Sequence, residues 1–305
     1  MKLFLFAGVL AFAGASARAA DSPTSPAPPP PYERSVPLPK VVAGPMEEIT
    51  ITSSRLPRIV RDFVDVATMP SPIGQVSRWK VRVCPRTTGM APAFTSFVTR
   101  RVREIGRDVG VPVNDSETCA PNLQIIFTER PQEMLDVIRV KLPELLGYHY
   151  APQAKELAAV EHPVQGWYAT GSRDRRGQLI FDNPYGMAMT TVEGSRIRTG
   201  LRSEFVAVTV VIDLVRVENQ EIGAIADQAA LLAFSQARAF ERCRDVPSVA
   251  NMFLACDAEL IATGLTRYDR AYLKALYAIT DRDTPGNHLK GDIAFLMRSY
   301  LREEE

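Results

Sequence analysis

Residues 221–240 predict a long helix with apolar side chains on nearly every face, and this constrains the fold more than any other stretch. Such a helix must be buried, because it leaves no polar face for solvent. The apolar fraction of 46% is ordinary for a globular protein with a real core. Asp227 and Gln228 should therefore lie inside the protein or at the wall of a cleft. Because a buried carboxylate must find a partner or change its pKa, these two residues are candidates for a small site.

The segments around this helix predict the fold class. Strand patterns cover 76–84, 122–127, 165–170, 177–181 and 205–215, and helical patterns cover 91–109, 131–146, 222–240, 248–254, 266–279 and 291–301. Strands and helices are mixed in the first part of the chain, and helices alone follow. This order predicts a single α+β (or α/β) domain over residues 76–303, with a mixed sheet followed by a C-terminal helical half.

The N-terminus has the pattern of a secretory leader. Lys2 precedes an apolar run over 3–12, and small residues follow this run. The run is too short to cross a bilayer, so residues 1–20 are expected to be a signal peptide that is cleaved near Ala19 or Ala20. The mature protein is then exported, either periplasmic or secreted.

Between the leader and the folded domain the chain is rich in proline. Nine prolines lie within residues 21–45, which predicts a disordered, extended linker. Residues 46–75 are expected to stay extended, with one short strand at Ile49 and Ile51. An edge strand at the start of the domain is the simpler interpretation of this strand. The stretch Met46–Pro57 also resembles the TonB box of outer-membrane receptors, which implies strand addition to the periplasmic energy-coupling protein.

The cysteines indicate how the exported domain is cross-linked. They are Cys84, Cys119, Cys243 and Cys256. An even number in an exported protein predicts two disulfides. We expect Cys84 to pair with Cys119 and Cys243 with Cys256, because pairs that are near in sequence close smaller loops. A tetrahedral metal site built from all four thiolates is the alternative, although the paired short spacings of zinc sites are absent.

The charge balance limits the partners. The chain has 36 basic and 35 acidic residues, and cleavage of the leader removes two of the basic ones, Lys2 and Arg18. A nearly neutral chain without a basic run predicts neither nucleic acid nor an anionic membrane surface as a partner. The mature chain has no segment that is long and apolar enough to be an integral membrane segment. An unknown protein or small molecule in the cell envelope is the expected partner.

A second motif opens the helix expected over 266–279. Thr266 can cap this helix, and Asp269 occupies its third position, near the positive end of the helix dipole. The pattern L-T-x-x-D-x-x-x-L-x-x-L-Y is matched by Leu265, Thr266, Asp269, Leu273, Leu276 and Tyr277. Together with the preceding strand and buried helix, it resembles secreted zinc metalloproteases of the zincin class. It resembles more closely a secreted bacterial family of unknown function that looks like a degenerate relative of them, which implies a zincin-like fold.

The zinc motif of the zincins is absent. A zincin needs H-E-x-x-H on its buried helix, because the two histidines bind the metal and the glutamate acts as the base. Here the buried helix has no histidine, and the chain has only His149, His162 and His288, all in expected loops. We therefore expect no metal and no cofactor. The resemblance then implies a pseudoenzyme, a non-catalytic binding or interaction domain on a metalloprotease-like scaffold.

Two other functions compete with this one. A hydrolase that uses carboxylates instead of zinc would pair Asp227 with Asp213, which ends an apolar strand, where α/β proteins often place functional acids. An aspartate that bonds to nearby backbone is the simpler interpretation of Asp213. An accessory role in TonB-dependent uptake would follow from the segment Met46–Pro57.

Overall fold

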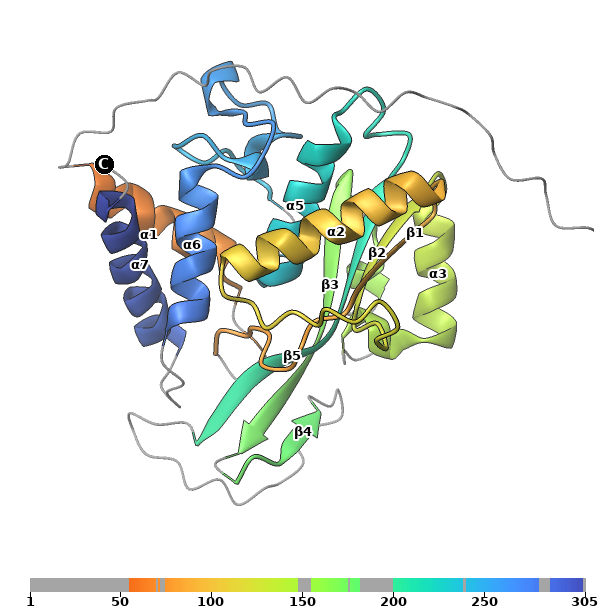
Figure 1. Ribbon diagram of the computed structural model, residues 1–305, viewed down its shortest axis with the longest axis horizontal. Coiled ribbons are helices and arrows are strands. Elements are labelled where there is room, and N and C mark those ends of the chain that lie inside the picture. The colour runs from red at the N-terminus through yellow and green to blue at the C-terminus, as the bar shows by residue number, and fades with distance from the viewer. Residues whose placement is uncertain are drawn as a thin grey trace, which may run out of the picture. The chain divides into compact units, whose positions relative to one another are not determined.

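One mixed sheet lies at the centre of the computed structural model (Figure 1). The structure describes residues 55–69, 71, 75–147, 155–174, 176–181, 200–237, 240–279 and 286–303. In this part of the chain the strands are β1 (Pro85–Thr88), β2 (Leu123–Thr128), β3 (Val164–Asp174), β4 (Leu179–Phe181) and β5 (Leu201–Asp213). Their order in the sheet is β1-β2-β5-β3-β4. The first three strands in this order are parallel to one another, and β3 and β4 run antiparallel to their neighbours.

Helices lie on both faces of the sheet. The α-helices are α1 (Leu56–Ala67), α2 (Pro92–Asp108), α3 (Pro131–Lys141), α5 (Ile222–Phe234), α6 (Arg267–Ala278) and α7 (Gly286–Glu303). Short 3-10 turns follow at η1 (Pro143–Leu146), η2 (Val249–Asn251) and η3 (Ala258–Leu260). The expected α+β architecture with a mixed sheet is confirmed. None of the helices in the described ranges is both long and apolar enough to cross a membrane.

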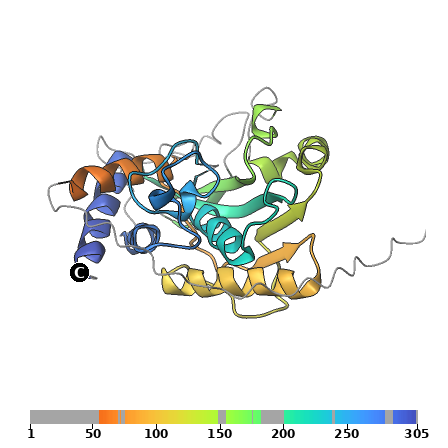
Figure 2. The same ribbon diagram turned by 90° about the horizontal axis from the view of Figure 1, so that it is seen from above.

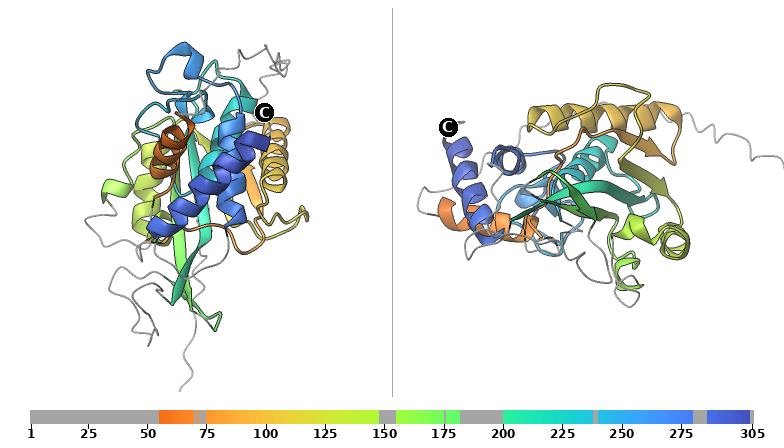
Figure 3. Two further views of the ribbon diagram at one scale, coloured as in Figure 1. Left: turned by 90° about the vertical axis from the view of Figure 1, so that its left-hand side faces the viewer. Right: turned by 90° about the horizontal axis from the view of Figure 1, so that it is seen from below.

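The two faces of the sheet have separate cores. On one face α2 and α5 pack against the sheet and against each other, as Figure 2 shows. On the other face α3 and η1 cover a smaller core around Leu135 and Trp167. The α1, α6 and α7 helices pack together beside the sheet (Figure 3). As the sequence predicts, α5 is buried along almost its whole length, because the sheet, α2, α6 and the η2 segment all contact it.

Two expected boundaries are wrong. The stretch 46–75 does not stay extended, because α1 occupies Leu56–Ala67, and the folded unit therefore begins before residue 76. Apolar residues at helical spacing bury one side of α1, and Pro57 fits its first turn, where no N–H bond is lost. The strand expected at Ile49 and Ile51 lies outside the described residues.

The strand expected over 76–84 is also displaced. This stretch forms isolated bridges, among them those from Arg78 to Glu204 and from Val83 to Val113, and the regular strand begins at Pro85. The alternation of apolar and polar residues predicts a strand over 76–84. In the structure this stretch has no continuous ladder of hydrogen bonds with a neighbouring strand in the described ranges. It still supplies buried side chains, among them Trp79.

Both expected disulfides are confirmed. Cys84 bonds to Cys119 and Cys243 bonds to Cys256. All four cysteines lie in the described part of the chain and no free thiol is left. The alternative of a four-thiolate metal site is therefore wrong.

The C-terminal end of α5 shows why this helix can end inside the protein. The last carbonyls of a helix have no partner within it, and a buried helix end must obtain donors from elsewhere. Four side chains supply them, one for each of the carbonyls of residues 231–234. Ser235 Oγ donates to Leu231 O at 2.6 Å, Trp79 Nε1 to Ala233 O at 2.9 Å and Tyr277 Oη to Phe234 O at 2.9 Å. The one hydrogen of Tyr168 Oη is shared between Leu232 O at 2.8 Å and Ala237 O at 2.5 Å. These donors tie α5 to β3, to the segment before β1 and to α6.

Replacing Tyr277 by phenylalanine tests this arrangement. The change keeps the ring but removes the donor to the Phe234 carbonyl, so we expect the free energy of unfolding to fall by about 1 kcal/mol. Urea denaturation followed by circular dichroism measures this change. Tyr300→Phe on α7 is the matched control, because no hydrogen bond of the Tyr300 hydroxyl to a described residue is present. Equal losses in the two variants would contradict the assignment.

Candidate functional site

Asp227 is held between three segments of the fold. It lies on α5 and is only 1% exposed. The Arg101 side chain on α2 donates from Nε to Oδ1 at 2.7 Å and from Nη2 to Oδ2 at 2.9 Å. The N–H of Leu265, just before α6, donates to Oδ2 at 2.8 Å. The buried carboxylate has thus found a partner, and its hydrogen bonds with Arg101 raise the pKa of that guanidinium.

Gln228 is buried as predicted but does not join a site with Asp227. It is 4% exposed, and its Oε1 has no hydrogen-bond partner among the described residues. Neighbouring positions on a helix point in different directions, so Gln228 does not share the contacts of Asp227. Asp227 and Gln228 are therefore adjacent in sequence but do not form one site.

Asp213 holds the turn that follows β5. Its Oδ1 accepts from the N–H of Val215 at 3.0 Å and from the N–H of Arg216 at 3.3 Å. This is the local backbone role that a strand-end aspartate commonly takes. In the part of the chain that the structure describes, no hydrogen bond joins Asp213 to Asp227.

Asp269 forms the predicted capping box with Thr266 at the start of α6. The carboxylate is fully buried and accepts from Ser248 Oγ at 2.5 Å, from Val249 N at 3.1 Å and from Thr266 N at 3.0 Å. Burial raises the pKa of Asp269. Asp269 therefore joins α6 to the η2 segment and is an internal structural acid.

The histidines do not converge in the described ranges. His149 lies outside them, His162 precedes β3, and His288 is an exposed residue of α7. Within those ranges, no three His, Cys, Asp or Glu side chains are grouped so that they could hold a metal ion.

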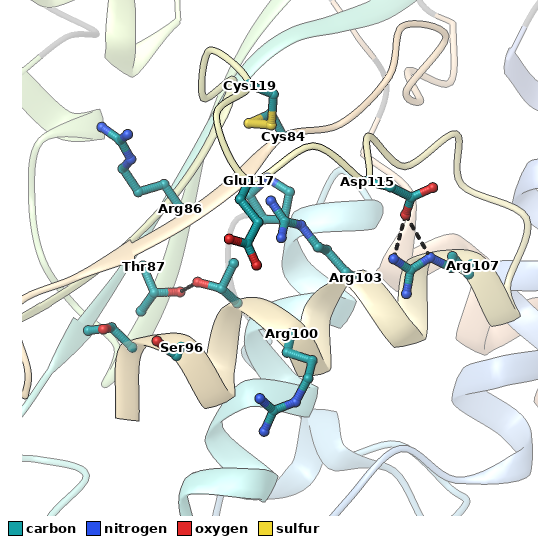
Figure 4. A pocket seen from close by; sticks show the side chains of 13 residues that line it. Cys84, Arg86, Thr87, Ser96, Arg100, Arg103, Arg107, Asp115, Glu117 and Cys119 are labelled. Carbon is teal, nitrogen blue, oxygen red and sulfur yellow. Dashed lines mark hydrogen bonds and ion pairs between the residues drawn. A yellow bond between two sulfur atoms is a disulfide. The ribbon is translucent and has the colours of Figure 1, made fainter. Parts of the chain in front are cut away.

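A cleft of about 500 Å³ lies between β1, α2 and the 115–119 loop, and we call it the β1–α2 cleft (Figure 4). Its lining is rich in cations and hydroxyl groups. The arginines are Arg86, Arg100, Arg103 and Arg107, and the hydroxyl residues are Thr87, Thr95, Ser96 and Thr99. Asp115 and Glu117 line the loop side, beside the Cys84–Cys119 disulfide.

The folding of this region explains how the cleft forms. The edge strand β1 supplies one wall and the α2 helix that follows it supplies the floor. The Cys84–Cys119 disulfide ties the 115–119 loop to the start of β1, so the loop faces α2 across the cleft. Thr99 Oγ1 donates to Thr87 Oγ1 at 2.8 Å, which fixes α2 against β1.

The positive charge of the β1–α2 cleft is only partly neutralised. Asp115 pairs with Arg107 through hydrogen bonds to Nε and Nη2, and these bonds lower the pKa of Asp115. Arg103 donates from Nη2 to the Ser116 carbonyl at 3.3 Å, but its buried Nε has no partner. Among the described residues, the Arg86 side chain has neither a hydrogen bond nor an ion pair. The guanidinium groups of Arg86 and Arg103 therefore have no ion pair with a described residue, and each can bind an anionic group.

This cleft is not predicted from the sequence, because its arginines do not form a continuous basic run. Arg100, Arg103 and Arg107 are spaced three and four residues apart, which places them near one another along a helix. This helical spacing is the feature of the sequence that could have predicted a cluster of arginines on one face of α2. Arg86 and the 115–119 loop come from separate segments, and the disulfide, together with the hydrogen bonds of Val83 to Pro112 and Asn114, brings them to the same place.

Comparison with known proteins finds no relative, because no protein-family model, no curated protein and no solved structure matches the chain.

Proposed function

We propose that this protein is an exported, non-catalytic binding domain that holds an anionic group of its ligand in the β1–α2 cleft. The observation that carries the proposal is that Arg86 and Arg103 both line the cleft, and neither has an ion pair with a described residue. A guanidinium without a counter-charge can form charge-assisted hydrogen bonds to an anionic group of a ligand. Ser96 on the same helix as Arg103 adds a hydroxyl group to the lining of the cleft.

Export is supported by the leader pattern and by the two disulfides, since disulfides persist outside the cytoplasm. A binding role rather than catalysis is supported by the use of the acids. The two carboxylates of a zinc-independent hydrolase would be Asp213 and Asp227, and these hold a turn and Arg101 respectively. A TonB-linked role would depend on Met46–Pro57, most of which lies outside the described residues.

Binding of small anions to the purified mature protein tests the proposal. Inorganic phosphate and citrate are titrated by calorimetry at low ionic strength, with chloride as the reference anion. We expect Arg103→Gln to weaken binding about tenfold, because one charge-assisted hydrogen bond is lost. Arg302→Gln on α7 makes the same charge change at an exposed site and should bind as the unmodified protein does.

Two results would overturn the proposal. One is the absence of binding by either anion at millimolar concentration. The other is equal weakening in the Arg103→Gln and Arg302→Gln variants, which would indicate a general charge effect in place of a site.

A further inference from the structure

The wall of the β1–α2 cleft is an edge of the sheet, and its main chain has open hydrogen-bonding groups. Leu123 N donates to Cys84 O at 3.3 Å, and the parallel register pairs Pro85 with Leu123 and Thr87 with Ile125. The main-chain N–H and C=O groups of successive residues point to opposite sides of a strand, so those of Cys84 and Arg86 face β2, and those of Pro85 and Thr87 face away from it. Proline has no N–H. Thr87 therefore offers one N–H and one C=O at the free edge.

Within the described ranges, this edge is covered only at its beginning. Val83 exchanges hydrogen bonds with the segment before the cleft loop, since Val83 N donates to Pro112 O at 2.7 Å and Asn114 N donates to Val83 O at 2.8 Å. After Asn114 the chain leaves the edge and forms the 115–119 loop. Among the described residues, none forms a hydrogen bond with the outward N–H and C=O of Thr87. The cleft begins where this cover ends.

The two available arginines lie on opposite sides of the edge. Successive side chains of a strand point to opposite faces. Thr87 points toward α2, where its hydroxyl contacts Thr99, so the Arg86 side chain points away from α2, as Figure 4 shows. Arg103 belongs to α2 and lies on the Thr87 side. A small anion on one face cannot reach both guanidinium groups.

We infer that the ligand is an extended peptide with two adjacent acidic residues, which adds as a strand to the free edge of β1. Adjacent side chains of the added strand point to opposite faces, so one carboxylate reaches Arg103 and the next reaches Arg86. The main chain of the peptide bonds to the open N–H and C=O of Thr87, as in other cases of strand addition. This inference rests on the proposed function, because it assigns the anionic group to such a peptide.

A peptide pair tests the inference. The probe is acetyl-Val-Thr-Glu-Glu-Thr-Val-amide, and its partner carries N-methyl groups on both glutamates. The partner keeps both charges, but it cannot donate main-chain hydrogen bonds from either glutamate, whichever register it takes. We expect the unmodified peptide to bind about tenfold more tightly, and Arg86→Gln and Arg103→Gln each to weaken it about tenfold. Arg302→Gln should leave its affinity unchanged.

The outcomes separate this inference from the proposed function. Equal affinity for the two peptides, or no effect of Arg86→Gln, would overturn strand addition. If phosphate or citrate binds in an Arg103-dependent way and the peptide binds no better than these anions, the inference fails while the proposed function stands. If neither the anions nor the peptide bind, both fail.

Discussion

Replacing Asp269 by alanine is expected to lower the free energy of unfolding by about 4 kcal/mol. Asp269 is fully buried, and the change leaves three donors without an acceptor: the Ser248 hydroxyl and the N–H groups of Val249 and Thr266. It also removes the negative charge at the start of α6, which interacts favourably with the helix dipole. Urea denaturation of the purified protein at neutral pH gives this difference by linear extrapolation.

Asparagine at the same position is the matched control. Its carbonyl oxygen can still accept from the Val249 and Thr266 N–H groups, and the Ser248 hydroxyl can rotate to accept from the amide. We therefore expect Asp269→Asn to lose less than half of what Asp269→Ala loses. Equal losses would mean that a neutral acceptor oxygen at this position does not hold η2 against α6, and that the charge of the carboxylate dominates.

The burial of Asp269 also predicts a direction of pH dependence. Burial raises the pKa of Asp269 above its ordinary value of 3.8, so the folded state keeps a proton that the unfolded chain has already lost. The stability from this group is complete below pH 3.8 and declines as the pH rises through the folded-state pKa. The stability of the unmodified protein relative to Asp269→Asn should fall accordingly as the pH rises from 3.8. A difference that increases with pH would contradict this sign.

The sequence predicts the local elements well where one pattern decides them. The α2 helix follows from apolar residues at helical spacing, and the α6 cap follows from Thr266 and Asp269. The disulfide pairs follow from sequence distance, because each closes a local loop. The α1 helix was not predicted, although Pro57 suits a first helical turn and the apolar residues that follow it have helical spacing.

The β1–α2 cleft and the partner of Asp227 could not be predicted in the same way. Burial of α5 predicts that the Asp227 carboxylate needs a partner, and Arg101 is that partner. That the partner is Arg101, and not another of the chain's arginines, depends on how α2 crosses α5. The cleft likewise depends on the position of the 115–119 loop, which the Cys84–Cys119 disulfide sets. Such positions arise from packing between distant segments, which no local pattern contains.

Replacing Asp227 by asparagine is expected to lower the free energy of unfolding by about 3 kcal/mol. The change keeps the shape of the side chain but leaves the Arg101 guanidinium without its counter-charge. The Arg101 side chain is 36% exposed, so water can solvate part of the orphaned charge, and the loss stays at the lower end for a buried pair. The Leu265 N–H can still donate to the amide oxygen. Urea denaturation measures the loss.

A double-mutant cycle then distinguishes a structural from a catalytic Asp227. If the two side chains act as a pair, Arg101→Gln in the Asp227→Asn background should cost about 1–2 kcal/mol less than it does alone. Arg100→Gln is the matched control on the same helix, with an expected change within about 0.5 kcal/mol, because its only ion pair in the described part of the chain is a 3.9 Å contact with Glu104. Unchanged stability of Asp227→Asn, together with loss of a hydrolytic activity, would overturn the structural role and would restore the hydrolase.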